Sequence, residues 1–203
     1  MTRRVALTLA TAAAVVSSMC AAAIATDRCV VDFFLLPDKR AFNAAKNRTA
    51  LPAAAEFDGA VTLDAMLAPG DDRRRWSQSR AGRIEGYVVR VHDAGPESAN
   101  CFSPTRLDAH IEVALGPDAP PSQRLIVEVT PPMRDWAARQ FRDWSTATLE
   151  RQLVGRRVRF EGWLLFDDEN DEEAENTRAG NDDNWRATAW EIHPVTSITV
   201  LAQ

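Results

Sequence analysis

The second half of the chain alternates short β-branched and aromatic runs with turn-forming residues, the pattern of a β-rich domain. Runs typical of strands cover residues 83–91, 110–115, 125–130, 158–166 and 186–200. Turn formers fill 93–104 and 116–121, between the first three runs. The pattern predicts five strands, with a bulge or bend at Gly86 in the first and a bend at Pro194 in the last.

A helical pattern separates the third and fourth of these runs. Apolar residues recur at helical spacing through 133–154, and Gly155 follows as a terminator. Ser145 is a good N-cap for a second helical segment within this stretch. We therefore expect one or two helices here, with Trp136 and Trp144 packed on the sheet.

The resulting order is strand, strand, strand, helix, strand, strand over about residues 82–202, and it resembles the OB-fold class, a five-stranded β-barrel. The run NWRATAWEIHPVTSI, residues 184–198, is similar to exported bacterial proteins of uncharacterised activity. The resemblance implies a mainly β fold with one or two helices, an OB-type barrel with its helix between strands 3 and 4. It implies no catalytic motif.

The N-terminus has the three parts of a secretory signal peptide. Arg3 and Arg4 are basic, residues 5–16 are apolar, and 23–25 read Ala-Ile-Ala, a small-x-small cleavage pattern. The alternatives are a buried N-terminal helix and lipidation at Cys20, which the large Met19 disfavours. We expect a signal peptide over 1–25 and a periplasmic or secreted protein. An N-terminal extension over 26–81, with helical composition at 39–47 and 63–67, then packs on an OB-fold domain over 82–203.

Cleavage after Ala25 leaves two cysteines, Cys29 and Cys101. An even pair in an oxidising compartment predicts one disulfide. It closes a loop of roughly 70 residues, which corresponds to about 4 kcal/mol in the chain-entropy model. The alternative is two unpaired thiols.

Composition narrows the functional classes. The apolar fraction of 45% suits one globular core, and no run beyond the N-terminus is long and apolar enough for a membrane span. The formal net charge of −5 repels phosphate backbones, so nucleic acid is a disfavoured partner.

Histidines and carboxylates lie on neighbouring predicted strands and give one candidate metal site. Side chains alternate along a strand, so His110 shares a face with Glu112, and Glu191 shares a face with His193. In an OB barrel the third strand lies between these two, and His92 is expected near His110 across a hairpin. Imidazole and carboxylate are ligands of zinc and similar metals. The candidate ligands on the outer sheet face are His110, Glu112, Glu128, Glu191 and His193. The alternative is a polar, solvated sheet face without metal.

Tryptophans and an acidic run give weaker signals. Trp163, Trp185 and Trp190, on the fourth and fifth runs, are candidate ligand-stacking residues, although packing is the commoner reason for a tryptophan. Half of the residues in 167–184 are acidic. They lack the spacing of an EF-hand, so a solvated loop is favoured over a calcium site.

No serine-nucleophile, cysteine-histidine or phosphate-loop motif occurs in the chain. Residues 90–93 resemble the opening motif of staphylococcal-type nucleases, but the carboxylates and arginines that should follow are missing. The prediction is a noncatalytic, cofactor-free envelope module that binds an unidentified protein or small molecule. The alternative is a metal-binding protein or metal-dependent hydrolase using the His/Glu face, and nucleic-acid binding is third.

Overall fold

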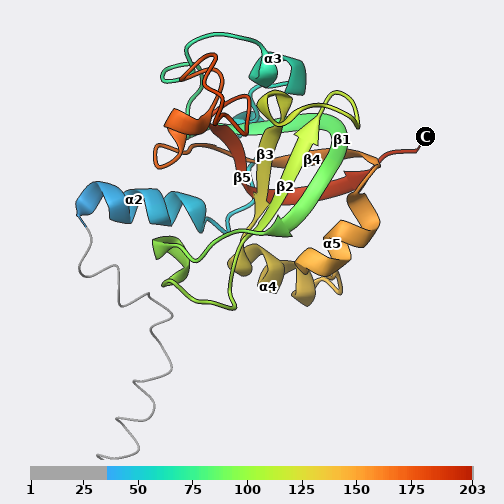
Figure 1. Cartoon of the computed structure of the whole chain (residues 1–203). Helices are drawn as coiled ribbons and strands as arrows, with labels where there is room; N and C mark the ends of the chain where they lie inside the picture. Colours follow the sequence, from blue (N-terminus) through green and yellow to red (C-terminus); the bar gives the residue numbers. More distant parts are fainter. Residues whose placement is uncertain (1–35, 203) are drawn as a thin grey trace, which may run out of the picture. The chain divides into compact units, whose positions relative to one another are not determined.

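Five strands close into a barrel in the computed structural model, which describes residues 36–202 (Figure 1). The strands are β1 (Ala81–Asp93), β2 (Ala109–Ala114), β3 (Leu125–Val129), β4 (Arg157–Phe166) and β5 (Trp190–Val200). Their order around the barrel is β1-β2-β3-β5-β4, with β3 and β5 parallel and the other neighbours antiparallel. The predicted five-stranded, OB-type barrel is confirmed.

Two helices lie between β3 and β4, as predicted, and cover one end of the barrel (Figure 1). They are α4 (Pro131–Arg139), which starts with two prolines, and α5 (Thr146–Leu153), which follows Ser145 at its N-cap. Apolar side chains of both helices join the strand residues in a single core: Met133, Ala137, Leu149 and Leu153 from the helices, and Ile111, Val127, Phe160, Leu164 and Ile192 from the strands. Trp136 and Trp144 pack against each other beside this core.

The segment before the barrel contains helices close to the predicted positions, α2 (Pro37–Lys46) and α3 (Leu63–Leu67). It packs on β4, where the Trp163 indole N–H donates to the Ala50 carbonyl at 2.8 Å and the Arg48 guanidinium lies 4.7 Å from the Trp163 ring centroid. Within residues 36–202, no helix combines the length and apolar character that a bilayer crossing requires.

The predicted signal peptide and Cys29 lie outside the described residues. The leader, export and the pairing of Cys29 with Cys101 therefore stay predictions.

Two local expectations for the strands were wrong. The irregularity in β1 falls between Val88 and Arg90, not at Gly86, which instead makes room for close packing. A Cβ at Gly86 would lie 2.5 Å from Leu63 and 2.6 Å from Val113. The last strand begins at Trp190, because the predicted first residues of this strand, 186–189, leave the sheet and form a buried connection.

β5 continues through Pro194, and its pairing with β4 is irregular around Gly162. Gly162 lies directly against the β5 backbone: a Cβ there would be 2.3 Å from the Pro194 carbonyl oxygen and 2.7 Å from Ile192 Cγ2. The barrel therefore closes at this point only if residue 162 has no side chain.

Gly162→Ala is expected to lower the free energy of unfolding by about 1–3 kcal/mol, because the methyl group meets backbone atoms that cannot move independently. The melting temperature should fall by about 2–4 °C per kcal/mol. The matched control is Gly95→Ala, since a Cβ at Gly95 meets nothing within 4 Å. Equal melting temperatures for the two variants would contradict this account of barrel closure.

Candidate functional site

A buried polar layer covers the outer side of β2, β3 and β5. Alternation directs Ile111, Val127 and Ile192 into the barrel core, so their neighbours project from the opposite face. The polar side chains on that face are His110, Glu112, Glu128, Glu191 and His193, and all of them are buried. The solvated sheet face considered as the alternative is wrong for these residues, since His193 is 0% exposed and Glu191 is 2% exposed.

Segments from three parts of the chain cover this layer. Lys46, at the end of α2, pairs with Glu97, which precedes the short helix η3 (Ser98–Asn100). The Asn100 side-chain amide donates to Asp108 Oδ1 at 3.0 Å. The connection between β4 and β5 contributes Asp167 and Arg186. These polar contacts hold α2, the η3 segment and the β4–β5 connection over the polar layer, so water is largely excluded from the layer.

Arg186 is fully buried and joins the β4–β5 connection to the sheet. Its Nη1 donates to Glu191 Oε1 at 2.6 Å, and its Nη2 donates to Asp167 Oδ2 at 3.0 Å. Burial opposes the charge of Asp167, but Arg186 and a hydrogen bond from Asn170 outweigh burial and hold the pKa of this carboxyl below its usual value. One guanidinium thus serves two buried carboxylates.

Glu191, held by Arg186, in turn positions His193. Its Oε2 lies 3.1 Å from His193 Nδ1, within hydrogen-bond distance. Because Glu191 is a carboxylate paired with Arg186, it is the acceptor of this contact and Nδ1 is the donor. Arg186 and Glu191 therefore fix the orientation of the imidazole.

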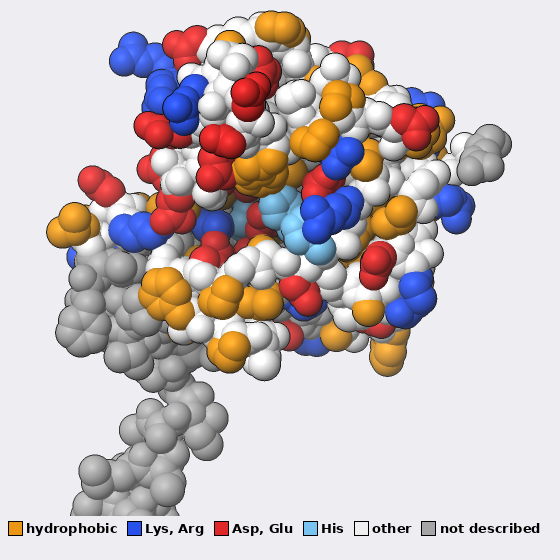
Figure 2. Space-filling view, in the orientation of Figure 1, with side chains coloured by type: hydrophobic (Ala, Val, Ile, Leu, Met, Phe, Trp, Pro, Cys, Tyr) orange, Lys and Arg blue, Asp and Glu red, His pale blue; other side chains and the backbone are white. Residues whose placement is uncertain are grey.

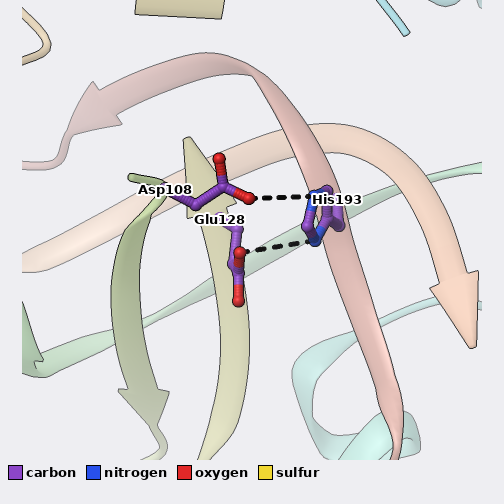
Figure 3. A group of neighbouring side chains, drawn as sticks. All are labelled: Asp108, Glu128 and His193. Carbon is purple, nitrogen blue, oxygen red and sulfur yellow. Dashed lines mark ion pairs between the residues drawn. The ribbon is translucent and has the colours of Figure 1, made fainter. Parts of the chain in front are cut away.

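Asp108 and Glu128 approach the two nitrogens of this imidazole from different elements (Figure 3). Asp108 directly precedes β2, and its Oδ2 lies 3.7 Å from His193 Nε2. Glu128, on β3, has its Oε2 3.6 Å from Nδ1. Neither Asp108 Oδ2 nor His193 Nε2 has a hydrogen-bond partner among residues 36–202, although both are buried. One ligand atom from each of Asp108, Glu128 and His193 lies within 4.8 Å of the other two.

Negative charge is in excess around His193. Carboxylates of Glu97, Asp108, Glu128 and Glu191 share this volume with the cations Lys46 and Arg186. Burial, together with Glu191 and Asp108, raises the pKa of Glu128 well above its ordinary value, and burial raises the pKa of Glu97 to about 7. Burial opposes the charge of Lys46, yet Glu128, Glu97 and Glu191 raise its pKa overall. The cluster therefore buries more carboxylates than permanent cations.

Of the five predicted metal ligands, four come together and one does not. His110 joins Glu128 with 3.8 Å between Nδ1 and Oε1, and Glu128 and Glu191 both meet His193. Glu112 is also buried, but it pairs instead with Arg124 at 2.7 Å and with Arg90 at 3.5 Å. His92 lies beside His110, as expected, because the two are paired across β1 and β2.

Sequence reasoning missed Asp108, Lys46, Glu97 and Arg186. A signal existed for Asp108, which lies two residues before His110 and so falls on the same face by strand alternation. No local signal marked Lys46 or Glu97, which reach the site from other segments.

The three candidate stacking tryptophans have different environments. Trp163 is covered by the N-terminal segment, and Trp190 is buried with its indole N–H donating to the Asp72 carbonyl at 2.7 Å. Only Trp185 is half-exposed, and it lies beside His110. Much of the acidic run is folded rather than simply solvated, since Glu175 accepts hydrogen bonds from Gly180 and Asn184.

The chain matches no protein-family model, and no curated protein is significantly similar to it.

Arg186→Met is expected to destabilise the protein by about 3–5 kcal/mol, because it leaves Asp167 and Glu191 buried without their cation. Thermal unfolding should show a fall in melting temperature on the order of 10 °C. Arg178→Met, at an exposed position in the same connection, is the control and should change little. Similar melting temperatures for both variants would rule out Arg186 as the organiser of the site.

The raised pKa of Glu128 predicts that the stability of chelator-treated protein depends on pH. This raised pKa means that the folded state binds more protons than the unfolded state above about pH 4.5. Stability should therefore fall as the pH rises from about 5 to about 8, as Glu128 and Glu97 lose their protons. Glu128→Gln should flatten this slope, whereas the exposed Glu150→Gln should preserve it. Melting temperatures across this range test the expectation, and an unchanged slope in Glu128→Gln would contradict it.

Proposed function

We propose that this protein is an exported, noncatalytic barrel that binds one divalent metal ion through Asp108, Glu128 and His193. The observation that carries the proposal is the pair of buried atoms Asp108 Oδ2 and His193 Nε2, which lie 3.7 Å apart and have no hydrogen-bond partner among residues 36–202. Buried polar atoms are normally hydrogen-bonded, so each exception calls for an explanation. A shared cation satisfies both atoms at once.

The donor set suits a divalent transition metal. Zinc bonds to imidazole nitrogen and carboxylate oxygen are about 2.0–2.2 Å long, so two ligands of one ion lie up to about 4 Å apart. The 3.7 Å separation of Asp108 Oδ2 and His193 Nε2 is within that limit. Glu128 Oε2 lies 3.6 Å from Nδ1, so its carboxylate supplies the third ligand by turning toward Nε2. One nitrogen and two oxygens are ligands that zinc, iron and manganese accept.

The surroundings of His193 supply the outer contacts that a metal-bound histidine needs. Ligating imidazoles usually donate their second N–H to a carboxylate, which orients the ring and makes the ligating nitrogen more basic. Glu191 accepts from His193 Nδ1 at 3.1 Å, and Arg186 in turn fixes Glu191 at 2.6 Å. Nε2 is therefore prepared for a cation on the side of Asp108.

A bound cation also resolves the charge imbalance. Without it, Glu128 is neutralised by a proton, because burial and the Glu191 and Asp108 carboxylates raise its pKa. A divalent ion replaces that proton and compensates Asp108 as well. Metal binding is therefore expected to release protons and to stabilise the fold.

The depth of the three ligands favours binding over catalysis. Asp108 is 1% exposed and His193 is 0% exposed, so a substrate has little direct access to the ion. The leader predicted over residues 1–25 supports export. The predicted leader and the buried ligands together favour an exported metal-binding module.

The first test is titration of chelator-treated, dialysed protein with Zn²⁺ by calorimetry, followed by elemental analysis. The expected result is one equivalent of zinc per chain. A free zinc concentration of 100 times the Kd should add about 2.7 kcal/mol to the free energy of unfolding. His193→Ala should abolish this binding, and Asp108→Asn should weaken it strongly.

The matched control is His92→Ala, which removes an imidazole outside the proposed ligand set. It should bind zinc with unchanged stoichiometry. The proposal would be overturned if the wild type bound none of Zn²⁺, Mn²⁺ and Ca²⁺. It would also be overturned if His193→Ala bound zinc as tightly as the wild type.

A further inference from the structure

A surface hollow lies beside the buried cluster, on the other side of His110. It has a volume of about 350 Å³ and is lined by Arg90, His92, His110, Glu112, Pro121, Arg124 and Trp185. This volume is at the lower end of the range of small-molecule sites. In Figure 2 histidine side chains, in pale blue, are visible in the middle of this face, with basic side chains, in blue, beside them.

Three rings form one wall of the hollow. His92 and His110 are stacked with centroids 4.7 Å apart and an interplanar angle of 19°, and Trp185 lies 5.5 Å from His110. The indole is held from behind, because its N–H donates to Glu173 and the Arg186 guanidinium lies 5.0 Å from its ring centroid. The wall is therefore rigid and aromatic, which suits a flat ligand.

His92 and His110 contribute their rings to the lining of the hollow. Their nitrogens without a hydrogen-bond partner among residues 36–202, His110 Nε2 and His92 Nδ1, are buried, so these atoms lie beneath the surface of the hollow.

The two arginines of the hollow have different roles. Arg124 is fixed, since its Nη1 donates to Glu112 at 2.7 Å and its Nε and Nη2 both donate to the Ala119 carbonyl. Arg90 has a side chain that is 61% exposed and only a 3.5 Å contact with Glu112. Its guanidinium is therefore held only weakly by Glu112 and has exposed N–H groups that suit a planar anion in bidentate geometry.

The local charge also favours an anion. Two guanidiniums face the single carboxylate of Glu112, whereas the whole chain has a formal net charge of −5. A positive hollow on an acidic protein selects anions locally while the rest of the surface repels large polyanions.

We infer that this hollow binds a small aromatic carboxylate, with its carboxylate on Arg90 and its ring against the wall of Trp185 and His110. The site needs no metal, so it is independent of the function proposed above. A ligand with a ring and one charged end uses the aromatic wall and the exposed Arg90 guanidinium together. A simple inorganic anion uses only the guanidinium.

The test is ligand-observed NMR and calorimetry on the purified protein in chelator, with benzoate, its neutral analogue benzamide, acetate and inorganic phosphate as probes. Benzoate is expected to bind with a Kd at or below about 1 mM. Benzamide and acetate should each bind at least tenfold more weakly. Phosphate should not compete with benzoate at equal concentration.

Arg90→Gln should weaken benzoate at least tenfold and remove its advantage over benzamide, a readout that a general loss of structure does not produce. Arg83→Gln is the matched control, because Arg83 is also an exposed arginine on β1 that pairs with a glutamate, Glu161, outside the hollow. Benzoate binding that is absent in the wild type, equal in Arg90→Gln, or displaced by phosphate would overturn the inference. Loss of zinc binding in His193→Ala with benzoate binding retained would confirm that the two sites are separate.

Discussion

The polar half of this molecule depends on the ion pairs that the buried Arg186 guanidinium makes with Asp167 and Glu191. This guanidinium binds Glu191 on β5 and Asp167 at the end of β4, and it also donates to the Asn170 carbonyl at 3.0 Å. Without it, two carboxylates remain in a region that water cannot reach, at a cost of several kcal/mol. With it, the acidic connection between β4 and β5 folds down over the sheet, and Glu191 is fixed as the acceptor that orients His193. The geometry of the candidate site therefore begins at a residue that is not one of its ligands.

A polar layer of this kind has to be explained energetically, because the barrel core does not need it. The inward side of β2, β3 and β5 already supplies a continuous apolar core, while the outward side buries more carboxylates than cations. Burying ionisable groups opposes folding unless they are paired, neutralised or bound to an ion. Protonation of Glu128 and Glu97 is one solution, and a metal ion at Asp108, Glu128 and His193 is the other. The second also satisfies the unpartnered atoms between Asp108 and His193.

His110 connects this buried layer with the outer hollow. Its Nδ1 lies 3.8 Å from Glu128 Oε1, and its ring also contacts the rings of His92 and Trp185. The two regions have opposite character, since the inner one is acidic and closed and the outer one is open, aromatic and positive. The proposed cation site and the proposed anion site therefore lie at different depths beside β2, and the neutral imidazole of His110 separates them.

The sequence by itself determined the barrel and the face on which the chemistry lies. Period-two alternation and turn residues predicted the strands closely, and alternation placed Glu191 with His193 and His110 with Glu112, because both signals are local. It did not indicate that Glu112 turns to Arg124, that residues 186–189 leave the sheet, or that Lys46, Glu97 and Asp108 complete the cluster. Those outcomes depend on which distant segments cover the sheet, and therefore on which polar groups lose contact with water. Only the tertiary structure decides this burial, since it arises from contacts between residues such as Lys46 and Glu97 that are far apart along the chain.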